Sequence, residues 1–253
     1  SYQNVLYRDI TAINARISGG QFNTSSLQTE SLPIVGVQLA SDLSMLPWSM
    51  RSYAPVIENV ANTNALVRVF QNGQKIYEKT VPAGPFRITD LTSFASGAMT
   101  LEITENGGEK KTYIIPVQNN MNLLKSGQKT FSIALGNYKT VEKLTDDSVL
   151  QGSYNYGLNN YLTLLSGINL TEDYQGVLLG AGLNTFFGGI SIKTNASQAT
   201  WLNQDYNGHK IALDYSYYLP AYKMNFYANA QTQTQHYLSV SNLLSYKNYD
   251  YLN

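Results

Sequence analysis

Residues 65–81 read ALVRVFQNGQKIYEKTV, two short β-prone runs on either side of Asn72-Gly73. An Asn-Gly pair between such runs is the strongest local signal for a β-hairpin, because both residue types tolerate the positive φ that a two-residue turn needs. A loop of this length also fixes the pairing of the two strands, so we expect Val69 to face Ile76. The stretch therefore predicts an antiparallel hairpin.

The chain turns sharply directly after this hairpin, where residues 81–91 read VPAGPFRITDL. Two prolines and a glycine so close together end a strand and form a stiff turn, because proline fixes φ and has no N–H to donate. Two further strands are expected at residues 99–105 and 110–117, joined by a turn at 106–108. Residues 53–117 are therefore predicted to form a small all-β sandwich. A unit of about 65 residues without disulfides should gain stability by docking onto a larger body.

The sequence before and after the sandwich alternates between apolar residues and polar or small ones. Segments of about ten residues with this alternation, separated by turn residues, are typical of transmembrane β-barrels. A strand is expected over residues 11–18, ended by Gly19-Gly20, and a second over 32–40. Seven more are expected between residues 130 and 229. The fold class predicted is all-β, with a sandwich placed between strands of an antiparallel transmembrane barrel.

The strands after the sandwich are expected to be joined alternately by short and long connections. Tight turns are predicted at Asn159-Asn160, Gly188-Gly189 and Pro220-Ala221, and longer polar loops at residues 138–148, 171–174 and 201–208. Short turns on the periplasmic side and long loops on the outside are a property of bacterial barrels. Segments 43–52 and 118–127 are predicted linkers into and out of the sandwich.

The alternation also predicts which side chains meet lipid. We expect Leu179 and Leu213 on the lipid side, and Asn184 and Asp214 on the side of the lumen. Tyrosines at strand ends are expected in aromatic girdles at the membrane surfaces. These are Tyr154, Tyr156, Tyr161, Tyr217, Tyr218 and Tyr222.

Composition supports a barrel and gives no support to nucleic-acid binding. The 253 residues carry 17 Lys+Arg and 17 Asp+Glu, so the net charge is zero. Charged residues make up 13% of the chain, about half the share of a typical soluble domain, while 20 tyrosines are present. Cysteine is absent, which excludes disulfides and thiolate metal sites. No run of 18 apolar residues occurs, so no transmembrane helix is predicted.

Candidate chemical groups are few, and we expect no enzyme. The only two histidines, His209 and His236, have no acidic partner at a telling spacing. The acidic pairs Asp146-Asp147 and Glu172-Asp173 fall in predicted loops, where carboxylates are usually solvated. Phosphate-binding glycine motifs and nucleophile elbows are absent. The sequence therefore predicts no catalytic residue, no cofactor and no metal site.

The segment 81–91 closely resembles the signature of fimbrial outer-membrane ushers, the pores of the chaperone–usher pathway. Residues 53–57, 36–42 and 45–47 also resemble that family, in the same order along the chain. The resemblance assigns the plug hairpin and family signature to Asn72, Gly73, Val81, Pro82, Gly84, Pro85, Phe86, Ile88, Asp90 and Leu91. It places the plug linkers at Pro47, Arg51, Tyr53, Pro55, Asn119 and Gly127.

The resemblance also implies an architecture and a function. It implies a barrel of 24 strands, with barrel strands in residues 1–52, the plug (middle) domain in 53–117 and further barrel strands in 118–253. The chain is then expected to be part of a longer protein of the bacterial cell outer membrane. Its partners would be periplasmic chaperone–pilus subunit complexes, pilus subunits and outer-membrane lipid. No nucleic-acid partner is implied, and a homodimer is compatible with the family. Subunits would be ordered by exchange of donor strands, a form of β-augmentation, without nucleotide.

Two other classes of protein stay open at this point. A passive gated porin with an inserted plug would let small solutes diffuse without a chaperone partner. A soluble β-sandwich adhesin-like binding module would not need detergent. The low charge and the many successive strand pairs argue against the soluble class.

Overall fold

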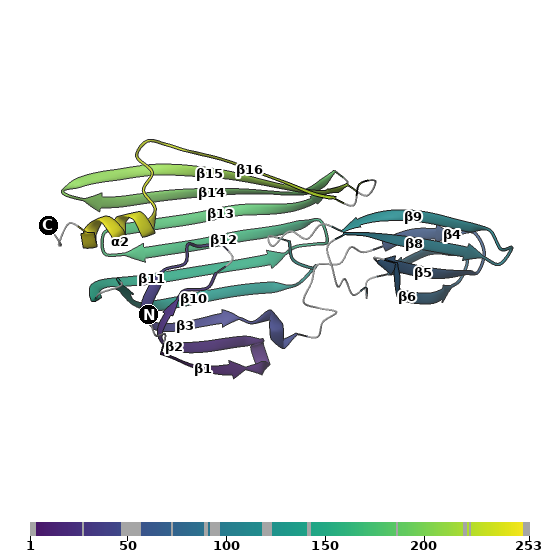
Figure 1. Cartoon of the computed structure of the whole chain (residues 1–253), viewed down its shortest axis with the longest axis horizontal. Coiled ribbons are helices and arrows are strands. Elements are labelled where there is room, and N and C mark those ends of the chain that lie inside the picture. The colour runs from purple at the N-terminus through teal and green to yellow at the C-terminus, as the bar shows by residue number, and fades with distance from the viewer. Residues whose placement is uncertain are drawn as a thin grey trace.

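The structure, a computed structural model, describes residues 4–26, 28–46, 57–71, 73–88, 91, 97–117, 123–140, 143–185, 187–219, 222 and 224–249. Within these residues the chain is built almost entirely of antiparallel strands (Figure 1). A long sheet holds, in spatial order, β1 (Val5–Ile10), β2 (Ala15–Asn23), β3 (Pro33–Ser41), β10 (Lys129–Lys139), β11 (Leu144–Gly157), β12 (Leu162–Thr171), β13 (Tyr174–Thr185), β14 (Gly188–Trp201), β15 (Gln204–Leu219) and β16 (Met224–Gln233).

The remaining strands form two small sheets between β3 and β10, which we call the inserted unit. One sheet pairs β4 (Ile57–Ala61) with β7 (Gly84–Ile88). The other has the order β6-β5-β8-β9 and contains β5 (Ala65–Gln71), β6 (Gln74–Val81), β8 (Gly97–Glu105) and β9 (Lys110–Val117). A single apolar cluster joins the two sheets, with Val67, Val69 and Leu101 from one and Ile57 and Ile88 from the other. The expected small sandwich is therefore present.

The inserted unit interrupts a pair of strands that are neighbours in the long sheet. Ala40 of β3 lies opposite Ser132 of β10, and the pairing continues to Ile34 and Tyr138. The unit lies beyond one end of the long strands (Figure 1). We call this the plug-side end of the sheet.

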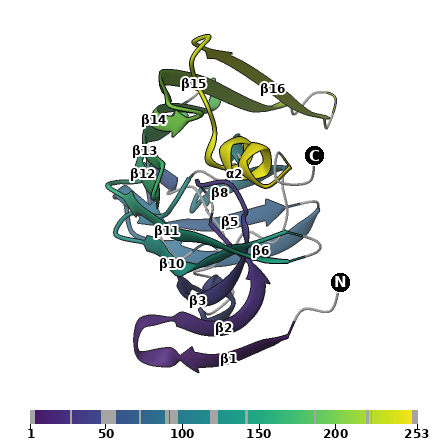
Figure 2. The same ribbon diagram turned by 90° about the vertical axis from the view of Figure 1, so that its left-hand side faces the viewer.

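The long sheet is curved, and its two faces differ in chemistry. Viewed along the strands, it traces an open arc, with α2 (Val240–Tyr249) on the concave side (Figure 2). Tyr174 and Ala199 pack with α2 and so mark the concave side. Strand alternation then puts Leu179 and Leu213, predicted to face lipid, on the convex side, where they are 62% and 40% exposed. Asp214 instead pairs with Lys193 at 2.9 Å and shares a cavity with Val240 of α2 on the concave side. We refer to the convex side as the outer face and to the concave side as the inner face.

The register predicted for the hairpin is wrong beyond its first two pairs. Gln71 and Phe70 pair with Gln74 and Lys75 as expected, but Val69 lies opposite Tyr77 and not Ile76. A β-bulge takes up the extra residue. Because of it, both Ile76 and Tyr77 pack against the core of the inserted unit, whereas a strict alternation would turn one of them away.

The strand predicted for residues 11–18 is confirmed only from Ala15 on, and its predicted end is wrong. Thr11–Ile13 form a 3-10 turn, and β2 continues straight through Gly19 and Gly20. Gly20 has a φ of +124°, and a Cβ at this position would lie 2.2 Å from the carbonyl oxygen of Asn4. The glycine therefore permits close approach of the neighbouring chain and does not end the strand.

The three long loops predicted after the inserted unit are short connections. They shrink to residues 140–143, 172–173 and 202–203. Gly188 and Gly189, expected to form a turn, are instead the first residues of β14. Leu202 and Asn203 both have positive φ, at 51° and 60°, as a two-residue hairpin turn requires. The polar residues that suggested loops are strand residues, because the inner face of the sheet is itself polar. Asp146 and Asp147 therefore lie on β11 and not in a loop.

Candidate functional site

The hairpin turn at the centre of the inserted unit has the expected length. β5 ends at Gln71 and β6 begins at Gln74, so two residues form the connection. Gly73 has a φ of +80°, and a Cβ there would meet nothing within 4 Å. Asn72 lies outside the described residues.

The segment 81–91 carries the chain from one small sheet to the other. Val81 is the last residue of β6, and Gly84, with a φ of +120°, is the first of β7. Between them lies Pro82, which cannot continue the strand ladder. Pro85 and Phe86 then pair with β4. These residues therefore form the corner of the sandwich.

The apolar residues of this segment hold the corner in place. Ile88 and Leu91 are buried in the core of the inserted unit, and Phe86 packs against it. Asp90 lies outside the described residues. We read the segment as a structural element, because its side chains build a core.

A buried carboxylate closes the other end of the inserted unit. Glu105, the last residue of β8, accepts hydrogen bonds from the Thr63 hydroxyl at 2.5 Å and from the amides of Asn62 and Thr63 at 3.0 and 2.8 Å. The Thr63 hydroxyl, followed by the two amides, holds the pKa of Glu105 below its ordinary value. The connection between β4 and β5 is thereby fixed to β8.

The segments that lead into and out of the inserted unit are anchored to the long sheet where they are described. On the way in, Asp42 accepts a hydrogen bond from the Ser44 amide at 2.8 Å and pairs with Arg16 at 3.2 Å. On the way out, Gly127, with a φ of +77°, donates its N–H to the carbonyl oxygen of Gly157 at 2.7 Å. The predicted linker residues Pro47, Arg51, Tyr53, Pro55 and Asn119 lie outside the described residues.

The inner face of the long sheet is lined by paired polar side chains. Asn155 donates to the Thr130 hydroxyl at 3.1 Å. Lys193 and Asp214 form an ion pair, and Asn229 donates to the same carboxylate at 2.6 Å. A sheet with this face turned to water and an apolar outer face matches the wall of an aqueous channel.

The connection between β2 and β3, residues 24–32, folds back over this inner face. Gln38 donates to the Ser25 carbonyl oxygen at 2.7 Å, and the Ser26 hydroxyl lies 2.9 Å from that of Ser153. Further along, Gln151 donates to the Glu30 carbonyl oxygen at 2.8 Å. These contacts hold the segment inside the curve of the sheet, where it narrows the space enclosed.

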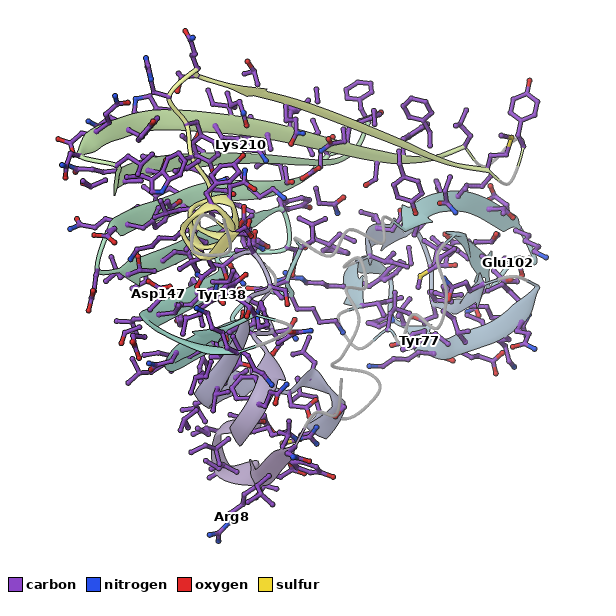
Figure 3. All side chains as sticks on the ribbon, turned by 60° about the vertical axis from the view of Figure 1, so that its left-hand side comes forward. Arg8, Tyr77, Glu102, Tyr138, Asp147 and Lys210 are labelled. Atoms are coloured by element: carbon purple, nitrogen blue, oxygen red, sulfur yellow. The ribbon has the colours of Figure 1, made fainter. Side chains whose placement is uncertain are left out.

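Helix α2 is fixed to the inner face by both apolar and ionic contacts. Val240, Leu243 and Leu244 are buried against residues of the sheet. Lys247 binds Asp147 at 2.8 Å and Asp173 at 2.5 Å. Figure 3 shows Asp147 and Tyr138 close to the helix. Burial opposes the charge on Lys247, but hydrogen bonds to the two carboxylates raise its pKa above the ordinary value.

Sequence reasoning missed this helix and its ion pairs. The pair Asp146-Asp147 was predicted to be solvated, whereas Asp147 is partly buried against Lys247. A signal was present: apolar residues at 240, 243 and 244 have helical spacing, and Ser239 accepts a hydrogen bond from the Asn242 amide at 3.3 Å, as a helix-capping residue does.

The described residues offer no site for metal chemistry. They contain no group of three or more His, Cys, Asp or Glu side chains that could hold a metal ion. His209 and His236 are both exposed. Among the described residues, no helix is long and apolar enough to cross a membrane.

Comparison with known proteins identifies the architecture. Residues 1–253 match the family described as "Outer membrane usher protein". The usher HifC of Haemophilus influenzae is 39% identical over 222 residues, which cover 87% of this chain and 26% of HifC. The chain therefore spans about a quarter of the length of the curated relatives it matches.

Two solved structures share the fold over nearly the whole chain. The translocation pore of the P pilus usher PapC matches with a TM-score of 0.59 and 30% identity, covering 97% of this chain and 50% of that one. A chain of the Escherichia coli P pilus tip assembly intermediate PapC-PapD-PapK-PapG matches with a TM-score of 0.68 and 30% identity, covering 95% of this chain and 30% of that one.

Proposed function

The chain belongs to the outer membrane usher family, and on this premise we propose that it forms the plug and the adjacent pore wall through which pilus subunits cross the outer membrane. Its partners are chaperone–subunit complexes on the periplasmic side and the pilus subunits that they deliver. The observation that carries the proposal is the insertion of a folded β-sandwich between β3 and β10, two paired strands of the membrane sheet. A domain in that position can open or close the pore without breaking the wall.

We assign residues 1–52 and 118–253 to the barrel and residues 53–117 to the plug. The contacts of the inserted unit support this division, because its buried core draws only on residues between Ile57 and Ile115. The segments on either side, 43–52 and 118–127, act as linkers. Gly127, with its positive φ, forms the turn through which the outgoing linker reaches β10.

We place the plug-side end of the sheet in the periplasm. At that end the connections other than the inserted unit are short, at residues 11–14, 158–161, 186–187 and 220–223. The opposite end also has short connections, at residues 140–143, 172–173 and 202–203, but apart from the inserted unit it alone carries longer excursions, residues 24–32 and the segment from 234 that leads into α2. Bacterial barrels have short periplasmic turns and longer external loops. An incoming chaperone–subunit complex would then meet the plug first.

In the resting pore, two segments inside the curve of the sheet narrow the channel, and the polar side chains of the inner face keep it hydrated. The segment 24–32 and α2 occupy the space inside the curve, held by hydrogen bonds, by ion pairs and by the buried side chains of Val240, Leu243 and Leu244. The inserted unit carries charged surface residues, including Arg68, Glu78 and Lys75, which bind one another at its exposed side. Such a surface fits a wet lumen better than a dry interface. A subunit complex can shift the plug only by binding the open state more tightly than the closed one.

The test is complementation of a bacterium that lacks its usher but retains the cognate chaperone and subunits. The intact protein that contains this chain should restore surface pili, and removal of the chaperone should abolish them. A passive porin would instead raise the uptake of small solutes in resting cells and leave piliation at zero. Recovery of the protein from the soluble fraction without detergent would favour the binding module.

A further inference from the structure

The connection that leads out of the inserted unit crosses neighbouring strands before it joins the long sheet. Gln128 extends the pairing of β10 with β11, because its carbonyl oxygen accepts a hydrogen bond from the Gly157 amide at 2.9 Å. Directly before it, Gly127 turns the chain with a φ of +77°. The Leu124 amide then donates to the Thr163 hydroxyl at 2.9 Å. Within a few residues the chain therefore passes from β10, across β11, to β12.

We call residues 123–128 the strap, and the strap lies on the inner face of the sheet. Gly157 and Thr163 lie opposite each other in β11 and β12, so they share a face. Strand alternation along β11 puts Gly157 on the face of Gln151, and Gln151 binds the segment 24–32 inside the curve. The strap therefore crosses the inner face at the plug-side end.

Gly157 makes room for the strap. A Cβ at this position would lie 2.1 Å from the carbonyl oxygen of Lys125 and 3.1 Å from that of Leu124. Both are backbone atoms, so no change of a side-chain rotamer could relieve the contact. Gly157 does not have a positive φ, so the strand itself would accept a residue with a side chain. The glycine is therefore needed for the close approach of the strap and not for the conformation of β11.

The strap is bound along its length. Leu123 and Leu124 are 6% and 5% exposed, and Thr163 is 1% exposed. At the other end, the Gln128 amide donates to the Lys125 carbonyl oxygen at 3.0 Å, and the Gln128 side-chain oxygen accepts from the Lys125 amide at 3.1 Å. A buried amide that loses its acceptor costs more than the hydrogen bond contributed. The Thr163 hydroxyl therefore has a large influence on whether the strap stays in place.

The strap separates the two points from which the inserted unit is held. β3 and β10 are neighbours, so without the strap the incoming and outgoing connections would start side by side. The outgoing connection is instead held at Thr163 on β12, and the incoming one at β2 through the ion pair of Arg16 with Asp42 at 3.2 Å. A body held at two separated points turns only about the line between them. The strap therefore restricts the directions in which the inserted unit can move.

We propose that the strap is the positioning device of the plug. Bound at Gly157 and Thr163, it carries the outgoing connection across the pore mouth and holds the plug over the lumen. Lifted from the inner face, it leaves the plug attached beside β3 and β10 alone, free to swing aside. The inference rests on the proposed function, since it requires the inserted unit to close the pore. Gly157 and Thr163 are positioning residues that act on the plug through the strap.

The experiment measures the ratio of open to closed time of single channels of the intact usher in planar bilayers. Thr163→Val removes the hydroxyl with little change of shape, and Thr163→Ser keeps the hydroxyl. Gly157→Val places a side chain where the strap backbone lies. The matched control is Thr194→Val, at an exposed position of β14. Each protein is checked for a folded barrel by its heat-modifiable band in gel electrophoresis, and Thr163→Val is repeated in a protein without the plug, with residues 54–116 replaced by a Gly/Ser linker.

We expect Thr163→Val to raise the ratio of open to closed time by on the order of fivefold, the factor that corresponds to one lost hydrogen bond. Gly157→Val should raise it further, because two backbone carbonyl groups must move. Thr163→Ser and Thr194→Val should behave like the unchanged protein. In the protein without the plug, Thr163→Val should leave the conductance unchanged, because the strap then holds nothing over the pore.

Three results would overturn the role of the strap while plug removal still opens the channel. The first is a folded Thr163→Val protein that opens no more than the unchanged one. The second is equal opening of Thr163→Ser and Thr163→Val, since the hydroxyl would then have no part. The third is a changed conductance of Thr163→Val without the plug, which would place the effect in the wall. If Gly157→Val does not fold, the two Thr163 variants decide the matter. If plug removal itself opens nothing, the proposed function fails and the strap fails with it.

Discussion

Replacing Gly73 by valine tests the hairpin on which the inserted unit is built. Gly73 has a φ of +80° and empty space around the position of a Cβ. The expected cost is therefore conformational, about 1–2 kcal/mol for a side chain held in the left-handed region. For a domain of 60–100 residues each kcal/mol lowers the melting temperature by roughly 4–8 °C. We expect Gly73→Val to melt about 4–16 °C below the unchanged segment.

The assay is thermal unfolding of residues 53–117, followed by circular dichroism. Gly107 is the matched control, because it too has nothing within 4 Å of a Cβ but does not have a positive φ. Gly107→Val should change the stability by less than about 0.5 kcal/mol. Equal melting temperatures for the two valine variants would show that strain at Gly73 does not govern this turn.

The other predictions concern the faces of the sheet and a buried acid. Leu213→Arg places a charge on the outer face at a cost of about 2–4 kcal/mol at the bilayer centre. The amount of folded barrel in the outer membrane, measured as the heat-modifiable band in gel electrophoresis, should therefore drop, while Asp214→Asn on the inner face should insert normally. The opposite ranking would mean that the faces are exchanged. Hydrogen bonds lower the pKa of Glu105 in the folded unit. They therefore stabilise the unit fully at a pH above the pKa that Glu105 has in the unfolded chain, and this stabilisation is lost as the pH falls through the lower pKa of the folded unit. The melting temperature of residues 53–117 should therefore drop below about pH 4–5, and less so in Glu105→Gln; identical pH profiles would contradict this role.

Local rules predicted the parts of the fold that depend on neighbours in sequence. Asn72-Gly73 gave the correct loop length, and Val81 to Gly84 gave the corner of the sandwich, because turn chemistry acts over a few residues. Strand alternation placed Leu179, Leu213 and Asp214 on the faces where the structure has them.

The errors arose where pairing between distant strands decides the conformation. Gly20 looks like a strand end, but its role is set by the approach of Asn4, which no local pattern reveals. The bulge at Ile76 places two adjacent side chains on one core, which a strict period of two excludes. Lys247 joins Asp147 across 100 residues of sequence, so the ion pair could not be inferred before the sheet was known.

Deleting the inserted unit tests the central claim most directly. In the intact usher, residues 54–116 are replaced by a short Gly/Ser linker, and the conductance of the purified protein is recorded in planar bilayers. The gating account predicts large channels that stay open, together with entry of bulky antibiotics into cells that carry the variant. A variant that inserts normally but conducts no better than the unchanged protein would contradict the claim that the sandwich closes the pore.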